Sequence, residues 1–230
     1  MSFSTIVGIF ILIAALCGNT ITAVDLARDG QFPYQVSLRT SSNVHFCGGS
    51  IVNVRWVLTS AQCLTLTTNF VVVVGTNSLE SPGIPYSVEL FINHPLFNRD
   101  TKVYDVGVVK TSTFILYSKT IQPVVLSFIP PTTGVPAVVT GWGVTTISSS
   151  ATSNSLQYLN TNLVSYTDCR NQITDSTLTI QSTQICTIKP QAGDCVADIG
   201  GPLVASFMQY GIASDYACGI SRYLLGFNKF

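Results

Sequence analysis

Residues 195–204 read Cys-Val-Ala-Asp-Ile-Gly-Gly-Pro-Leu-Val. The two glycines and the proline predict a tight turn, and the apolar residues after them predict entry into a strand. The cysteine that begins the stretch would tie the turn to another part of the chain through a disulfide. We therefore expect a covalently braced loop that leads into a buried strand.

This stretch resembles the nucleophile loop of trypsin/chymotrypsin-like (S1 family) serine proteases, which reads Gly-Asp-Ser-Gly-Gly-Pro. Ile199 stands where that family has its serine. The isoleucine side chain has no atom that could attack a carbonyl group, whereas catalysis in this family begins with the serine hydroxyl. The resemblance therefore implies a serine protease homologue without its nucleophile.

Two further segments extend the resemblance. Residues 56–63 read Trp-Val-Leu-Thr-Ser-Ala-Gln-Cys, where the family ends Ala-Ala-His-Cys, so Gln62 takes the place of the general base. A carboxamide has no useful proton affinity near neutral pH. Residues 104–109 resemble the family's Asn-Asp-Ile-Ala-Leu-Leu strand and put Asp105 at the position of the triad aspartate. The alternative for Asp105 is an ordinary aspartate at the end of a strand. We favour an inactive, vestigial triad in which Gln62 is the partner of Asp105.

The loop that holds Ile199 departs from the family at a second position. By resemblance, the backbone amides of Ala197 and Ile199 correspond to the oxyanion hole, and the family has glycine at the first of these. Asp198 corresponds to the aspartate that pairs with the new N-terminal amine after activation. Because an unpaired buried carboxylate is costly, we expect Asp198 to find another partner, to become protonated or to lie in a zymogen-like loop.

The resemblance also identifies the specificity pocket. Its base would be Gly193, with Asp194 adjacent, and its wall would be Ser214, Asp215 and Tyr216. A tyrosine in place of the family's glycine would narrow or plug the pocket, and without an acidic base the pocket would not select Lys or Arg. Drift in an unselected site is the alternative interpretation.

The chain has seven cysteines, of which Cys17 lies in an apolar N-terminal segment. The other six permit fifteen pairings, so their spacing alone does not choose among these. The resemblance implies the three pairs Cys47–Cys63, Cys169–Cys186 and Cys195–Cys218. No Cys-x-x-Cys motif occurs and only two histidines are present, which argues against a zinc site. We expect no metal and no cofactor.

The N-terminal segment predicts secretion. Residues 6–16 are almost wholly apolar and small residues follow, which is typical of a signal peptide at about 1–20, with cleavage after Gly18, Thr20 or Ala23. A short membrane anchor is the alternative, although spanning a bilayer takes about 20 apolar residues. A secreted protein would form its disulfides in an oxidising compartment.

The rest of the chain, residues 21–230, predicts one S1-like domain. Its length, its many Val, Ser and Thr residues and the absence of long helical periodicity suit an all-β fold. The resemblance implies two six-stranded Greek-key antiparallel barrels, at about 31–120 and 121–230. Residues 31–38 resemble the opening of the first barrel in arthropod digestive proteases.

The C-terminal stretch departs most from the family. After Cys218 the family has a strand with Pro-Gly-Val-Tyr and then a helix, and residues 219–230 show neither pattern. We expect either a second barrel that lacks its last strand and the C-terminal helix, or a sequence from an altered or mispredicted transcript. An open barrel would expose a strand edge, which promotes aggregation.

The functional expectation is a secreted, inactive protease homologue that acts by protein binding. By analogy with inactive family members, its partner would be a protease, an inhibitor or a cascade component. With 11 basic and 11 acidic residues in 230, the chain has no basic run for nucleic acid, and we expect a monomer without membrane attachment after signal removal. Two rivals are an enzyme with another nucleophile, such as Ser214, Thr59 or Ser60, and a truncated product without function.

Overall fold

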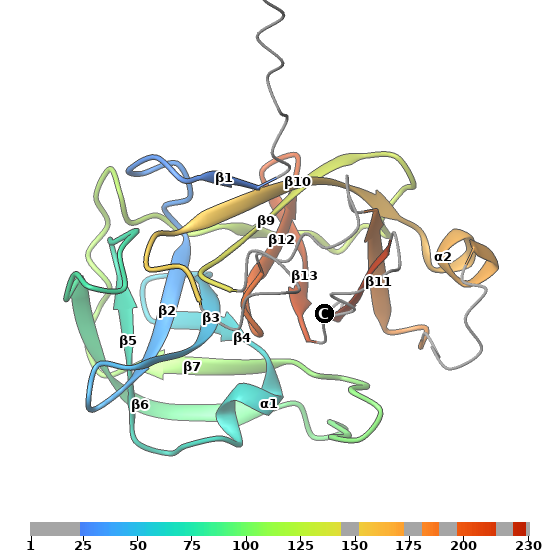
Figure 1. The fold of residues 1–230 in the computed structure, drawn as a ribbon. Coiled ribbons are helices and arrows are strands. Elements are labelled where there is room, and N and C mark those ends of the chain that lie inside the picture. The colour runs from blue at the N-terminus through green and yellow to red at the C-terminus, as the bar shows by residue number, and fades with distance from the viewer. Residues whose placement is uncertain (1–23, 144–151, 173–180, 189–196, 215–222, 229–230) are drawn as a thin grey trace, which may run out of the picture.

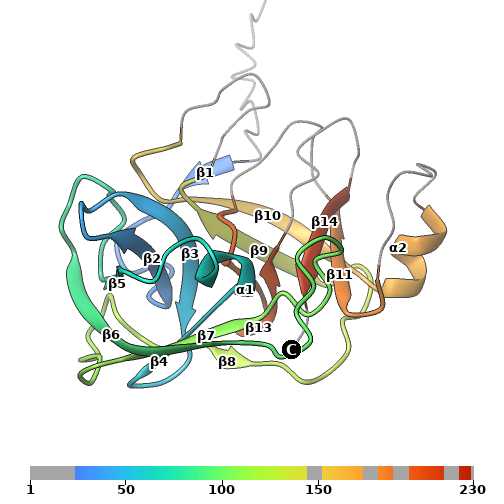
Figure 2. The same cartoon turned by 90° about the horizontal axis from the view of Figure 1, so that it is seen from below.

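A computed structural model describes residues 24–143, 152–172, 181–188, 197–214 and 223–228. The chain forms two antiparallel β-barrels that lie side by side, the first on the left and the second on the right in both Figure 1 and Figure 2. Within the described ranges there are two short helices, α1 (Ala61–Leu64) and α2 (Tyr166–Gln172). The predicted all-β fold of two barrels is confirmed.

The first barrel closes in the strand order β2-β3-β4-β7-β6-β5. Its strands are β2 (Gln35–Thr40), β3 (His45–Ile51), β4 (Trp56–Thr59), β5 (Phe70–Val74), β6 (Ile84–Asn93) and β7 (Gly107–Thr111). β5 is a β-branched run that is almost wholly buried, and burial alternates along β7, as suits strands of a closed barrel. The inward side chains form one apolar core that includes Val36, Ile51, Val72 and Val109.

The second barrel is also closed, because each strand pairs with the next in the ring β9-β10-β11-β14-β13-β12 and β12 returns to β9. Its strands are β9 (Pro136–Gly141), β10 (Gln157–Val164), β11 (Gln184–Ile188), β12 (Pro202–Ala205), β13 (Met208–Ala213) and β14 (Tyr223–Asn228). Its core includes Val139, Leu159, Leu163 and Leu203.

The expectation that the last strand is absent is wrong. β14 pairs with β11 through Ile188↔Tyr223 and with β13 through Ile212↔Asn228. A Tyr-Leu-Leu-Gly-Phe-Asn segment supplies enough aromatic and apolar residues for a strand without the family's Pro-Gly-Val-Tyr pattern. The described residues after β13 contain no helix.

Two short strands join the second barrel from outside the ring. β1 (Val24–Leu26) pairs with β10, so the start of the described chain lies on the second barrel before the first barrel begins. β8 (Val125–Leu126), in the connection between the barrels, pairs in parallel with the start of β13.

Buried polar bonds join the barrels. The Ser50 hydroxyl donates to Gln209 Oε1 at 2.6 Å, and the Thr140 hydroxyl donates to Gln35 Oε1, also at 2.6 Å. Because buried polar groups are costly unless paired, these bonds fix how the barrels face each other. The candidate site draws residues from both barrels and depends on that arrangement.

Candidate functional site

Helix α1 positions Gln62. It follows β4 directly, and the side chain of Ser60 caps its first turn by accepting a hydrogen bond from the backbone N–H of Cys63. Cys63 forms a disulfide with Cys47 of β3. The cap and the disulfide together hold the one-turn helix against the first barrel, so the position of Gln62 is fixed by its neighbours.

Gln62 and Asp105 form a direct pair. The backbone N–H of Gln62 donates to Asp105 Oδ1 at 2.7 Å, and its carboxamide Nε2 donates to Asp105 Oδ2 at 2.9 Å. The carboxamide nitrogen also donates to the backbone carbonyl of Ser214, and the Ser214 hydroxyl donates to Asp105 Oδ2. Gln62 therefore sits against Asp105 as a donor, in the place where the resemblance puts an imidazole.

Burial dominates the electrostatics of Asp105. Its side chain has no exposed surface, and desolvation raises the pKa of its carboxyl group above the usual range. Hydrogen bonds from Ser214 and Gln62 and the charge of Lys102 lower the pKa and offset part of that rise. Lys102 also donates to Gln62 Oε1 at 3.2 Å, so both ends of the carboxamide are hydrogen-bonded.

The Gln62 side chain cannot act as a base in this arrangement. Its nitrogen is an N–H donor without a lone pair for a proton, and its oxygen is a weak acceptor that faces a lysine. A general base must take a proton within hydrogen-bond reach and have a pKa near the working pH. The carboxamide of Gln62 takes up no proton near neutral pH, so it cannot act as a base even though both of its ends are hydrogen-bonded.

Ile199 lies in the turn before β12, half-buried, with its side chain packed against the core of the first barrel. Its backbone carbonyl accepts a hydrogen bond from Gly48 N at 2.8 Å. The next residue, Gly200, has φ +85°, and a Cβ there would lie 2.2 Å from Thr59 Oγ1. Glycine is therefore required in this turn, and the turn directs the hydrocarbon side chain of Ile199 onto the first barrel.

Ala197 packs elsewhere. It is buried in the core of the second barrel, whereas Ile199 contacts the first. The two positions that the resemblance assigns to an oxyanion hole thus anchor the loop to both cores.

Asp198 has found another partner, which was one of the three expectations. Both of its carboxylate oxygens accept from the backbone N–H of Trp142, at 3.0 and 3.1 Å. Its Oδ2 lies 3.4 Å from His45 Nε2, and the exposed fractions of the His45 and Asp198 side chains are 9% and 5%. The His45 ring packs edge-on against the Trp142 ring, with centroids 5.3 Å apart.

A hydrogen-bond chain extends from His45 into the first barrel. His45 Nδ1 lies 2.9 Å from Ser37 Oγ, which accepts from Arg39 Nε at 2.9 Å. When the imidazole is neutral and its Nε2–H faces Asp198, Ser37 must be the donor to Nδ1. Arg39 is fully buried, and its other guanidinium bonds go to Asn43 and to the carbonyls of Ser78 and Ser81.

Sequence reasoning did not reveal this run of hydrogen bonds. The structure makes His45 a side-chain partner of Asp198. The available signal was the polar–apolar alternation of Gln35–Thr40, which puts Ser37 and Arg39 on the same face of the strand. The contact itself joins residues 153 positions apart in the chain, which no local pattern reveals.

The three hydroxyls named as alternative nucleophiles are engaged in structural hydrogen bonds. Thr59 donates to the carbonyl of Gly48 at 2.8 Å, Ser60 caps α1 and Ser214 donates to Asp105. The second histidine, His94, stacks on Tyr104 with ring centroids 4.7 Å apart.

The disulfides Cys47–Cys63 and Cys169–Cys186 are both formed, as the resemblance implied. Of the pocket residues, Ser214 is described and buried. The remaining sequence-predicted site residues, Gly193, Asp194, Asp215, Tyr216 and the pair Cys195–Cys218, lie outside the described residues. The structure therefore brings together Gln62, Asp105 and Ser214, and places Ile199 on the adjoining turn.

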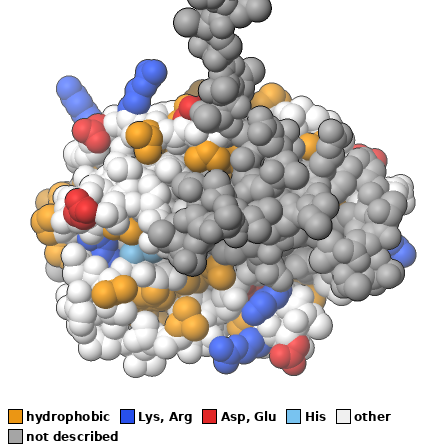
Figure 3. All heavy atoms as spheres, viewed as in Figure 1, with side chains coloured by type: hydrophobic (Ala, Val, Ile, Leu, Met, Phe, Trp, Pro, Cys, Tyr) orange, Lys and Arg blue, Asp and Glu red, His pale blue; other side chains and the backbone are white. Residues whose placement is uncertain are grey.

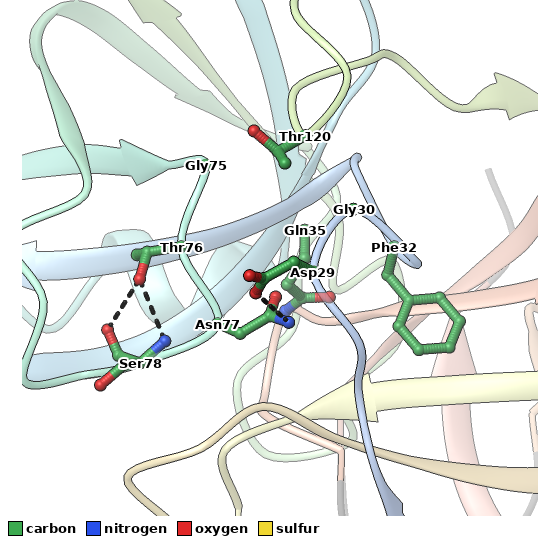
Figure 4. A pocket seen from close by; sticks show the side chains of 9 residues that line it. All are labelled: Asp29, Gly30, Phe32, Gln35, Gly75, Thr76, Asn77, Ser78 and Thr120. Carbon is green, nitrogen blue, oxygen red and sulfur yellow. Dashed lines mark hydrogen bonds between the residues drawn. The ribbon is translucent and has the colours of Figure 1, made fainter.

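A separate cavity of about 290 Å³ lies between the segment that enters β2 and the loop after β5. Figure 4 shows Asp29 and Asn77 directed toward each other there, and their side chains are 3.5 Å apart. Asn77 also donates to the carbonyl of Ala27, and its own carbonyl accepts from the Trp142 indole. These bonds tie the N-terminal segment to both barrels, so we assign this cavity a structural role.

The described part of the chain contains no cluster of three or more His, Cys, Asp or Glu side chains suited to a metal ion. Among the same residues, no helix is long and apolar enough to cross a membrane.

Comparisons with known proteins agree with the fold. Residues 21–230 match the family model described as Trypsin. The chain is 35% identical to trypsin delta of Drosophila melanogaster over 195 residues, which cover 84% of this chain and 77% of the relative. It is 34% identical to trypsin beta of Drosophila erecta over 211 residues, 90% and 81% of the two chains.

A solved structure extends this likeness. Neuropsin, a serine protease expressed in the limbic system of mouse brain, superposes with a TM-score of 0.80 at 26% identity, over 90% of this chain and 93% of that chain. The family model spans both barrels and every described residue of the site. The chain therefore belongs to the trypsin family of serine proteases.

Proposed function

We propose that this chain is a secreted trypsin-family protein without peptidase activity, which acts by binding another protein. The observation that carries the proposal is the contact between Gln62 and Asp105, in which a carboxamide lies where the resemblance puts the catalytic base. Ile199, which has no nucleophilic atom, stands on the adjoining turn.

The expected loss of activity is large. In a related triad, removal of the nucleophile or of the base alone lowers kcat about a millionfold, and combined losses hardly add. The assistance that remains in such enzymes, roughly 10³–10⁴-fold, comes from the oxyanion hole and substrate binding. Here Ala197 is buried in the core of the second barrel, and its Cβ restricts the backbone at a position where the family has glycine. This residual assistance should therefore be weakened as well.

Secretion is supported by the apolar segment at residues 6–16 and by two formed disulfides, which suit an oxidising compartment. The proposed partner is a protein: a protease, an inhibitor or a component of a proteolytic cascade. On the face shown in Figure 3, the described charged side chains are scattered and hydrophobic side chains gather over the first barrel. A neutral, partly apolar surface suits a protein partner better than nucleic acid.

Labelling with a fluorophosphonate probe tests the inactivity. The secreted protein should remain unlabelled, and the variant Ile199→Ser/Gln62→His, which returns a hydroxyl and an imidazole, is the matched positive control. Labelling of the unaltered protein at a residue of the described site would overturn the proposal.

Titration calorimetry with a protein inhibitor of trypsin-like proteases tests the binding role. If the Gln62→Arg variant abolishes the heat of binding, the inhibitor binds over the Gln62–Asp105 site. If the protein binds no inhibitor, protease or cascade component, the proposed binding role is wrong.

A further inference from the structure

The hairpin between β12 and β13 has an unusual turn. Its two central residues are Ser206 and Phe207, with φ of 48° and 64°, and the flanking Ala205 and Met208 pair directly. A two-residue turn with positive φ at both positions is of the type that favours Asn-Gly, because side chains with a Cβ are strained there. A phenylalanine at such a position is rare.

Phe207 is also almost fully exposed, at 94%. The turn therefore combines backbone strain with a large apolar side chain held in water, and nothing in the hairpin itself is gained by either. A glycine at this position would remove both costs. An aromatic side chain on a rigid turn, however, suits a role as an anchor at an interface, where aromatic residues contribute most of the binding energy.

A groove of about 630 Å³ begins at this turn, and Ser206 and Phe207 are among the residues that line it. Its walls are mainly apolar and include Phe32, Pro33, Pro123, Ala137 and Val204, and none of the residues that line it is charged. The same surface thus presents a protruding phenyl ring and, beside it, an apolar hollow large enough to receive one.

Exposed apolar residues continue this surface along the connection between the barrels. Val125 of β8 pairs with Met208, the residue after Phe207, and is 64% exposed. Phe128 and Ile129 follow and are 83% and 66% exposed. We call Phe207, the groove and these three residues the hairpin face.

We propose that the hairpin face joins two copies of this chain in a symmetric dimer, in which Phe207 of each copy enters the groove of the other. A twofold interface requires a self-complementary surface, and a knob beside a matching hollow provides one. Because the groove carries no charge and the chain is neutral overall, two copies meet without like-charge repulsion.

The available area is compatible with a small stable interface. Such interfaces bury about 800 Å² per partner. Phe207 and Phe128, both almost fully exposed, supply roughly 300–400 Å² of this, since an aromatic side chain buries about 150–250 Å². Val125, Ile129 and the groove walls supply the remainder. From the sequence we expect a monomer, whereas this surface points to a dimer independently of the function proposed for the cleft.

Analytical ultracentrifugation of the full secreted protein from about 0.1 to 100 μM tests the dimer. The unaltered protein should shift from the monomer mass to twice that mass as its concentration rises. The variant Ser206→Asn/Phe207→Gly, which makes the turn Asn-Gly, should remain monomeric throughout. In dilute samples, where both proteins are monomers, its Tm should rise by about 2–4 °C because the turn strain is relieved.

Phe114→Ala is the matched control, because Phe114 is also an exposed aromatic residue, at 63%, but lies outside the hairpin face. It should leave the dimer intact. If the Asn-Gly variant fails to fold, Phe207→Asn alone keeps a residue that tolerates this backbone conformation. A wild-type protein that stays monomeric at every concentration would overturn the proposal, as would a dimer that persists without Phe207.

Discussion

Replacing His45 with phenylalanine tests whether the Asp198 loop depends on its buried partner. The substitution keeps a ring against Trp142 but removes both ring nitrogens, so Asp198 Oδ2 loses the group 3.4 Å away and Ser37 Oγ loses the group 2.9 Å away. Among the described residues, Asp198 would retain the Trp142 N–H.

The size of the effect follows from these contacts. The His45–Asp198 contact, at 3.4 Å, is longer than an ordinary N–H···O hydrogen bond, so we assign it about 1.5 kcal/mol, the lower end of what a bond to a charged group contributes. The neutral bond to Ser37 adds about 0.5–1.5 kcal/mol. We therefore expect a loss of roughly 2–3 kcal/mol in the free energy of unfolding, which for a chain of this size lowers the Tm by about 5–10 °C.

Urea denaturation at neutral pH, followed by tryptophan fluorescence, measures this loss. The double variant Asp198→Asn/His45→Phe is the matched control, because a neutral amide keeps the Trp142 bond and does not bury a charge. It should lose about 1 kcal/mol less than the sum of the single variants. A loss below about 0.5 kcal/mol for His45→Phe, or strictly additive losses, would show that Asp198 does not depend on His45.

Two further predictions concern the candidate site. Because burial raises the folded-state pKa of Asp105 above its unfolded value, its contribution to stability is fully present below about pH 3.9 and is lost as the pH rises through the folded pKa. Urea titrations from pH 3 to 7 should measure the difference in the free energy of unfolding between the unaltered protein and Asp105→Asn. This difference should fall as the pH rises and then level off. A difference that rises with pH would contradict the prediction. Gly200→Ala should cost about 2–4 kcal/mol, because backbone strain adds to overpacking against Thr59 and Gly48. Gly134→Ala is its control, since Gly134 has a similar φ of +89° but open space around a Cβ, and equal losses at the two sites would refute the packing argument.

Much of the fold could be predicted from the sequence because three blocks and six cysteines occur in the order of a known family. The positions of Gln62, Asp105 and Ile199 follow from residues within those blocks. The final strand could not be predicted from the same reasoning, since Tyr223–Asn228 lacks the expected motif and its place is decided by pairing with β11 and β13. Strand pairing between distant segments is a tertiary property that a local pattern does not contain.

The partner of Asp198 was unpredictable for a similar reason. The sequence established that a buried carboxylate needs a partner, but Asp198 meets His45 and Trp142 only after both barrels have formed. The strained turn at Phe207 depends on backbone angles, which the dipeptide Ser-Phe does not reveal.

The central claim is that a carboxamide and a hydrocarbon side chain have replaced the groups that perform the chemistry. Hydrolysis of a broad peptide library by the purified secreted protein, with products identified by mass spectrometry, tests it most directly. We predict no cleavage above buffer. Cleavage that purifies with the protein and disappears in the Asp105→Ala variant would contradict the claim.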